Sequence, residues 1–212
     1  MDPASDAQYI LMGLALLALP LGFIAWMGLR RPDRTRRAAE AAARALSLPE
    51  LPSLHRRMRI FAGRVMDLQV DVASEPQLAA IFDPVPIEHS LTQGFLVRAI
   101  FPRPLAVSFR IDSSRGAPEG LDPHELGLVF PLKVVTGNEA GFHHLMRGGE
   151  PAQAVNALFG GKAEGSGRIV RAESRGVFVF AQGLKAEDAT VLAHAVVKAA
   201  TLLATRDIFG RR

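Results

Sequence analysis

A chain of 212 residues that is 49% hydrophobic and 22% charged has room for one packed domain with an appendage, and it is too apolar to be intrinsically disordered. It contains no cysteine, which excludes a disulfide framework, a thiolate metal site and a cysteine nucleophile. Ten arginines give residues 30–64 a net charge of +7, whereas the rest of the chain has no basic surplus, so we expect no nucleic-acid partner.

An uncharged run of 21 residues, Tyr9 to Leu29, predicts a transmembrane helix. At ~1.5 Å per residue the run spans roughly 30 Å, the thickness of the hydrocarbon core of a bilayer. The only tyrosine, Tyr9, and the only tryptophan, Trp26, lie near its two ends, where aromatic rings favour the membrane interface. A signal peptide would have basic residues before the run, but residues 1–8 are acidic and are expected to form a short extracytoplasmic N-terminus. A buried core helix is the alternative.

Five arginines follow this run within eight residues: Arg30, Arg31, Arg34, Arg36 and Arg37. Basic residues beside a span are retained on the cytoplasmic side, and no basic residue precedes the run. We therefore expect a single-pass protein of the inner (cell) membrane, with its N-terminus outside and its C-terminal domain in the cytoplasm. The five arginines are expected to contact anionic lipid headgroups, each contact contributing ~1 kcal/mol.

Small residues form one stripe along the predicted span: Ala15, Ala18, Gly22 and Ala25. Small side chains allow another helix to approach closely, which is the usual basis of helix association in membranes. The stripe predicts packing against a transmembrane helix of another copy or of a different protein. The alternative is that it only reflects an alanine-rich composition.

Residues 30–53 are expected to form a basic juxtamembrane helix and linker. Asp33 can cap a helix that begins at Arg34, and prolines at 49 and 52 end it. Because leucine occurs in this segment only near its end, the helix has little apolar face. We expect it to lie in solvent or on the membrane surface, with a binding surface for a partner as the alternative.

A cytoplasmic domain of the α+β class is predicted for residues 54–212, with a mainly antiparallel sheet covered by helices. Strands are predicted twice within 58–72, at 95–101 and 105–112 as neighbours, and as a hairpin at 167–173 and 176–182. A further strand is predicted within 126–135, where Pro131 indicates either a sheet edge or a bulge. Helices are predicted at 139–147, 151–159 and, as a long C-terminal helix, 185–206. One core is expected to contain Leu105, Val107, Phe109, Phe178, Phe180, Leu192 and Val196.

Few polar side chains are candidates for catalysis or for metal binding. Asp122, His124 and Glu125 fall on a predicted loop, and His143 and His144 are adjacent on a predicted helix, where neighbouring side chains diverge by ~100°. Polar residues at a turn are more often solvated than metal-bound, so we expect no metal, no cofactor and no catalytic residue. The sequence has no nucleophile elbow and no zinc-protease motif, and residues 159–168 lack the spacing of a phosphate-binding loop.

The features follow the order of span, arginine-rich segment, alanine-rich helix, strand pair from Arg59, and a final strand pair with a helix over 168–206. This order resembles that of bacterial single-span membrane proteins with a cytoplasmic α+β domain of unknown function. The resemblance implies the architecture and brings no site residues. We expect a membrane-anchored accessory or scaffold subunit of a membrane assembly, which binds partners through its span and its domain. The alternative is a membrane-tethered enzyme or ligand-binding domain for a small molecule or a lipid.

Overall fold

The computed structural model describes residues 34–52, 59–74, 94–113, 121–128, 132–158 and 168–209. The chain divides into two compact units, Met1–Asp33 and Arg34–Arg212, and the second unit holds all the described residues. The predicted transmembrane helix, with its stripe of small residues and its interface residues Tyr9 and Trp26, lies outside the described residues, as do Arg30 and Arg31.

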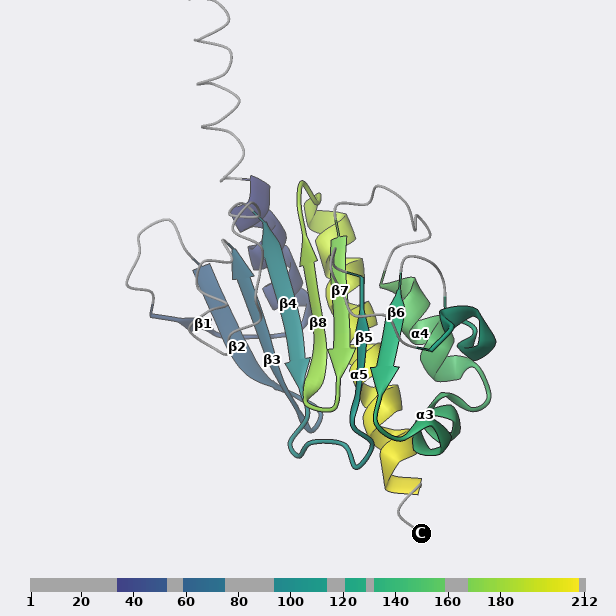
Figure 1. Cartoon of the computed structure of the whole chain (residues 1–212). Coiled ribbons are helices and arrows are strands. Elements are labelled where there is room, and N and C mark those ends of the chain that lie inside the picture. The colour runs from purple at the N-terminus through teal and green to yellow at the C-terminus, as the bar shows by residue number, and fades with distance from the viewer. Residues whose placement is uncertain are drawn as a thin grey trace, which may run out of the picture. The chain divides into compact units, whose positions relative to one another are not determined.

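An antiparallel sheet of eight strands forms the centre of the folded unit (Figure 1). The strands are β1 (Glu50–Leu51), β2 (Arg59–Val65), β3 (Leu68–Ser74), β4 (Phe95–Ile100), β5 (Phe109–Asp112), β6 (Lys133–Thr136), β7 (Arg168–Glu173) and β8 (Gly176–Ala181). Their order across the sheet is β1-β2-β3-β4-β8-β7-β5-β6. The predicted α+β class, the antiparallel sheet, the hairpin of β7 with β8 and the edge position of β6 are confirmed.

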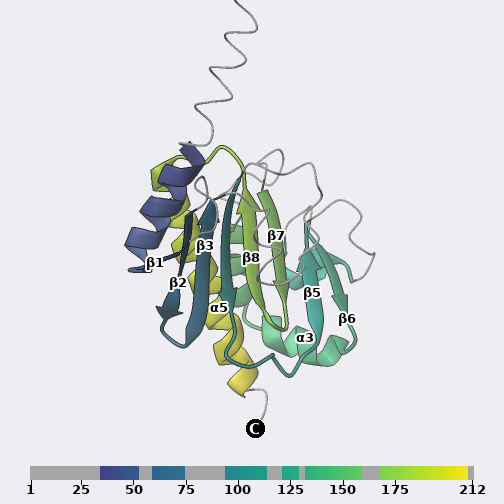
Figure 2. The same ribbon diagram turned by 90° about the vertical axis from the view of Figure 1, so that its left-hand side faces the viewer.

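The helices among the described residues cover one face of this sheet (Figures 1 and 2). They are a helix at residues 34–45, α3 (Glu139–Met146), α4 (Glu150–Ala157) and α5 (Ala186–Phe209), while η2 (Pro123–Leu126) is a single 3-10 turn. The three helices predicted after residue 138 are confirmed with small shifts at their ends. Acidic Glu187 and Asp188 in the first turn of α5 suit the helix dipole.

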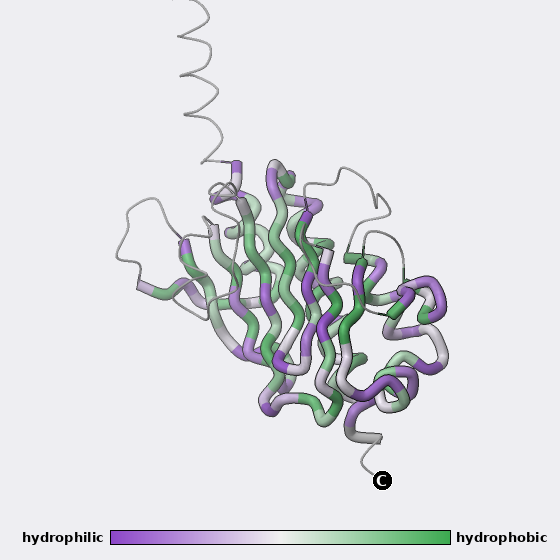
Figure 3. Tube along the Cα trace, viewed as in Figure 1, coloured by the Kyte–Doolittle hydropathy of each residue, from purple (hydrophilic) through white to green (hydrophobic). Residues whose placement is uncertain are grey.

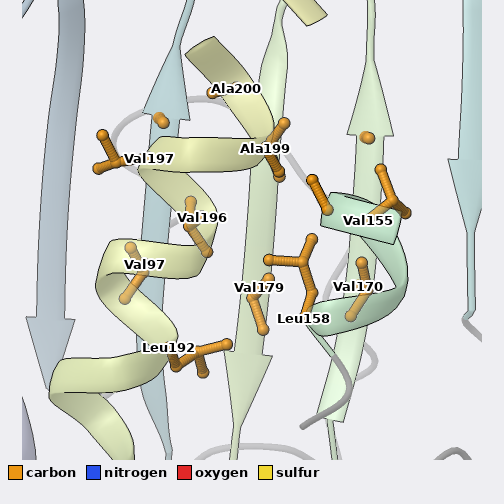
Figure 4. Packing of buried hydrophobic residues seen from close by; sticks show 14 of the residues in the cluster. Val97, Val155, Leu158, Val170, Val179, Leu192, Val196, Val197, Ala199 and Ala200 are labelled. Atoms are coloured by element: carbon orange, nitrogen blue, oxygen red, sulfur yellow. The ribbon is translucent and has the colours of Figure 1, made fainter. Parts of the chain in front are cut away.

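The main hydrophobic core lies between the sheet and these helices. The central strands are largely hydrophobic along their length (Figure 3). From α5, Leu192 and Val196 lie over β4 and β8 (Figure 4). Val155 of α4 and its C-cap residue Leu158 lie over β7. Since these side chains are at most 2% exposed, their packing should supply much of the stability of the unit.

The predicted core residues divide between two faces of the sheet, which corrects the expectation of one core. Four of the seven belong to the main core: Leu105, Phe109, Leu192 and Val196. Half-buried Val107 packs against it. Phe180, however, belongs to a small separate cluster with Ala73 and Leu96, and Phe178, two residues earlier on β8, shares its side of the sheet. Successive side chains of a strand alternate between faces, so β8 is buried on both.

The two strands predicted at 95–101 and 105–112 are not neighbours. β4 pairs with β3 and β8, and β5 pairs with β6 and β7, so the hairpin of β7 and β8 separates them. The chain between them passes the turn of that hairpin, where the N–H of Phe101 donates to the carbonyl of Arg175 (2.9 Å) and that of Leu105 to the carbonyl of Ser174 (2.7 Å). Only Phe109–Asp112 of the second predicted strand is therefore in the sheet.

The helix at residues 34–45 is part of the folded unit, contrary to the predicted solvent-exposed helix and to the predicted boundary at residue 54. Its buried side consists of Ala38, Ala39, Ala42 and Ala43, each at most 1% exposed, and these alanines belong to the main core. The helix lies beside α5 (Figure 2). Alanines at this spacing occupy one side of a helix, so an apolar face exists without large side chains.

This helix ends in a hydrogen-bonded cap before the first strand. Ser47 has a φ of +54°, and the N–H of Leu48 donates to the carbonyl of Ala43 (2.9 Å), which satisfies a carbonyl at the helix end. Leu46 and Leu48 are both buried. After this cap the chain continues into β1, which pairs with β2 in antiparallel orientation.

We expect Gly176→Ala to lower the free energy of unfolding by about 1–3 kcal/mol, because a new methyl group would force the backbone of two strands apart. A Cβ atom on Gly176 would lie 2.4 Å from the carbonyl oxygen of Ala99. Gly137→Ala is the matched control, since a Cβ there meets nothing within 4 Å. Thermal unfolding of both variants checks this, and equal melting temperatures would contradict the close approach of β4 and β8.

Candidate functional site

The outward side of the helix at residues 34–45 is basic. Arg34, Arg37 and Arg44 are exposed and share the side of the helix opposite the buried alanines. The side chain of Arg36 instead donates to Glu40 at 3.0 Å. Of the five arginines predicted to contact lipid headgroups, the structure therefore presents Arg34 and Arg37 on this surface, together with Arg44, which is not one of the five.

The residues Asp122, His124 and Glu125 lie at η2. The carboxylate of Asp122 accepts a hydrogen bond from the N–H of His124 (2.9 Å) and caps this turn. His124 and Glu125 are exposed. In the part of the chain that the structure describes, no three His, Cys, Asp or Glu side chains are grouped so that they could hold a metal ion.

The two adjacent histidines lie in the last turn of α3, and both are exposed. His144 lines a pocket, and His143 is not among the residues of its lining. The divergence predicted for adjacent helical positions therefore gives the two side chains different surroundings.

This pocket, of about 290 Å³, lies between α3, the C-terminal part of α5 and the chain before β5. It is lined by Ala106, Val107, Asn138, Gly141, His144, Leu145, Arg206 and Asp207. The buried carboxylate of Asp207 accepts a hydrogen bond from the N–H of Ala106 (2.8 Å), which fixes one wall. The guanidinium of Arg206 donates to Glu150 of α4 at 2.9 Å, and Asn138 caps α3 by accepting from the N–H of Gly141 (2.9 Å). The walls of the pocket thus come from α3, α5 and the chain before β5.

Two buried ion pairs lie on the face of the sheet opposite the main core. Arg98 Nε is 2.6 Å from Asp71 Oδ2, and Arg171 Nη2 is 2.8 Å from Asp112 Oδ2, with all four side chains at most 7% exposed. In the strand register these residues form one row with Phe178 between the two arginines. Buried charges need partners of this kind, because an unpaired charge in the interior is strongly destabilising.

Arg168, at the start of β7, is a further half-buried cation. Its guanidinium donates to the carbonyl of Leu158 at 2.8 Å and so satisfies a group at the end of α4. Burial lowers the pKa of Arg168, and the nearby carboxylate of Asp188 opposes this shift. The contact joins the start of β7 to the end of α4, so we assign Arg168 a structural role.

Most of these polar residues cannot be recognised from the sequence. Asp71 and Asp112 alternate with apolar residues in their strands, and alternation alone does not distinguish a solvent-facing charge from one paired within a covered face. Asn138 could have been found, since an asparagine directly before the acidic start of a helix is typical of an N-cap. No pattern in the sequence indicates that Arg206 shares a pocket with α3.

One described helix meets the length and hydropathy of a membrane span. It is Ala186–Asp207 of α5, with a mean hydropathy of 1.2 over its most apolar stretch, of which 44% is buried. Because its inner stripe packs against β4 and β8, we interpret α5 as a core helix of the folded unit.

Comparison with known proteins adds a distant likeness. The crystal structure of the mycobacterial trehalose monomycolate transport factor A, TtfA, is similar over 79% of this chain and 93% of that chain, with 13% identity and a TM-score of 0.45. No protein-family model and no curated protein matches the sequence. A likeness this distant says nothing of what the chain binds or does.

Proposed function

We propose that the chain is a membrane-anchored accessory subunit, held by the uncharged run before Arg30 with its N-terminus outside and its folded unit at the cytoplasmic surface of the inner membrane. The observation that supports this most is the helix at residues 34–45. Only residues 30–33 separate the end of the run from its start, and its alanine side is packed into the main core of the folded unit.

Residues 30–33 are all that lies in the sequence between the uncharged run and this helix, and four residues extend over at most about 14 Å. The exposed arginines of the helix, Arg34, Arg37 and Arg44, would then lie within reach of anionic headgroups. Because the alanine side of the same helix is fixed in the core, contact with lipid would restrict the orientation of the whole unit.

The surroundings of the polar candidate residues favour an accessory role over a catalytic one. The candidates at η2 serve a turn or face solvent, and the described residues contain no cluster of three His, Cys, Asp or Glu side chains that could hold a metal ion. We propose that partners are bound through the small-residue stripe of the span and through the folded unit, with another copy or a different membrane protein as the partner.

We expect Gly22→Leu to reduce recovery of a partner, or of a homodimer, when the protein is purified in mild detergent. A leucine in the stripe would separate the helix backbones, and close packing is the main attraction between helices in lipid. Chemical crosslinking in membranes before solubilisation, followed by identification of the crosslinked chain, measures the loss.

Leu21→Ala is the matched control for this experiment, since it changes a residue on another side of the same predicted helix and should leave recovery unchanged. Insertion should persist in both variants, because each substituted residue is apolar. Equal behaviour of the two variants would show that the span is a plain anchor, and it would remove the proposed helix partner.

A further inference from the structure

The pocket beside α3 presents more hydrogen-bond donors than acceptors. Because the N–H of Gly141 donates to one end of the Asn138 amide, that end is the oxygen, and the Nδ2 group remains as a donor. Arg206 has five N–H donors, of which one contacts Glu150. His144 adds an exposed imidazole.

The acidic groups nearby are already engaged. Asp207 Oδ1 accepts from the backbone of Ala106 within the wall, and the Asp207 residue is 6% exposed. Glu150, whose side chain is 63% exposed, lies outside the lining. An incoming anion would therefore meet donors from α3 and α5 without displacing an existing bond.

The remaining walls of the pocket are apolar. Val107 and Leu145 face the same space as the donors. A side chain at Gly141 would displace the Asn138 amide, since its Cβ would lie 2.8 Å from Asn138 Nδ2. A volume of about 290 Å³ is near the lower end for small-molecule sites. Donors at one side and apolar side chains at the other suit a small amphipathic anion.

We propose that this pocket binds a carboxylate attached to a short apolar group, with the carboxylate at Asn138, His144 and Arg206 and the apolar group against Val107 and Leu145. Such a group occurs in a free carboxylic acid and at the C-terminus of a protein chain. The inference goes beyond the proposed accessory role, because it concerns the folded unit alone and its test needs neither the membrane partner nor the orientation.

The test uses the full chain in a non-ionic detergent and two carboxylate probes, hexanoate and N-acetylleucine, each compared with its neutral amide. Isothermal titration should show saturable binding of a carboxylate at least tenfold tighter than of its amide, because charge-assisted hydrogen bonds exceed neutral ones by that amount. Tighter binding of hexanoate would indicate a free acid, and tighter binding of N-acetylleucine would indicate a chain terminus. In a protein labelled with carbon-13 at histidine, the signal of His144 should move and that of His143 should not.

Two matched pairs of variants locate the site. Arg206→Gln and His144→Gln should weaken binding, by about tenfold for the arginine, whereas Arg147→Gln and His143→Gln, which change exposed residues outside the lining, should not. Melting temperatures of the four variants show that each is folded. Equal binding of carboxylates and amides, equal effects within either pair, or no saturable binding of any probe would overturn the proposal.

Discussion

A fragment of residues 54–212 should fail to reach the native state, whereas a fragment of residues 34–212 should fold cooperatively. The shorter fragment lacks β1 and the six buried side chains before it: Ala38, Ala39, Ala42, Ala43, Leu46 and Leu48. Burial of these side chains contributes roughly 6–9 kcal/mol, at about 1.5–3 for each leucine and about 0.8 for each methyl group. This is comparable to the whole free energy of unfolding of a domain, about 5–15 kcal/mol. Circular dichroism during thermal unfolding and size-exclusion chromatography measure the difference.

A variant of the fragment of residues 34–212 distinguishes the contribution of the buried alanines from that of the exposed arginines. Replacing Arg34, Arg37 and Arg44 with glutamine leaves every buried alanine in place, so this variant should unfold at nearly the temperature of its parent. If the fragment of residues 54–212 unfolds within a degree or two of the longer one, the helix at residues 34–45 is not part of the core.

The best-predicted elements were those with large side chains in a regular period. The inner stripe of α5 and the alternation at positions 68, 70 and 72 of β3 could be predicted because leucine and valine recur at fixed spacing. Strand β8 could be predicted because its valines and phenylalanines form a continuous apolar run. The helix at residues 34–45 has an equally regular buried side, but that side is made of alanine. Since alanine is common on exposed helices as well, its burial depends on tertiary contacts that the sequence does not show.

The order of the strands in the sheet and the polar sites could not be predicted from the sequence for a different reason. Alternation identifies a strand without identifying its neighbour, so the insertion of the hairpin β7–β8 between β4 and β5 could not be predicted. Nothing in the sequence distinguishes His143 from its neighbour His144. Only the packing of α3 beside α5 places His144 at the pocket. The pocket joins residues separated by about one hundred positions along the chain, such as Ala106 and Asp207.

Replacing Arg98 with methionine should lower the free energy of unfolding by about 3–5 kcal/mol, because it leaves the carboxylate of Asp71 buried without its ionic partner. The two side chains are 4% and 6% exposed, and their 2.6 Å contact is a charge-assisted hydrogen bond. Gln69 also donates to Asp71, at 3.0 Å, but a neutral amide does not neutralise the charge. At 2–4 °C per kcal/mol, the melting temperature should fall by roughly 10 °C.

The double variant Asp71→Leu with Arg98→Met distinguishes loss of a charge partner from loss of volume. It removes both charges, so the desolvation cost of the carboxylate disappears, and replacement of a buried pair by apolar residues is often neutral or stabilising. The double variant should therefore be more stable than Arg98→Met alone, although it carries one more substitution. Arg64→Met, at an exposed arginine of β2, should change stability by less than about 0.5 kcal/mol. A double variant no more stable than the single one would mean that Arg98 stabilises the sheet through its packing, with little contribution from its charge.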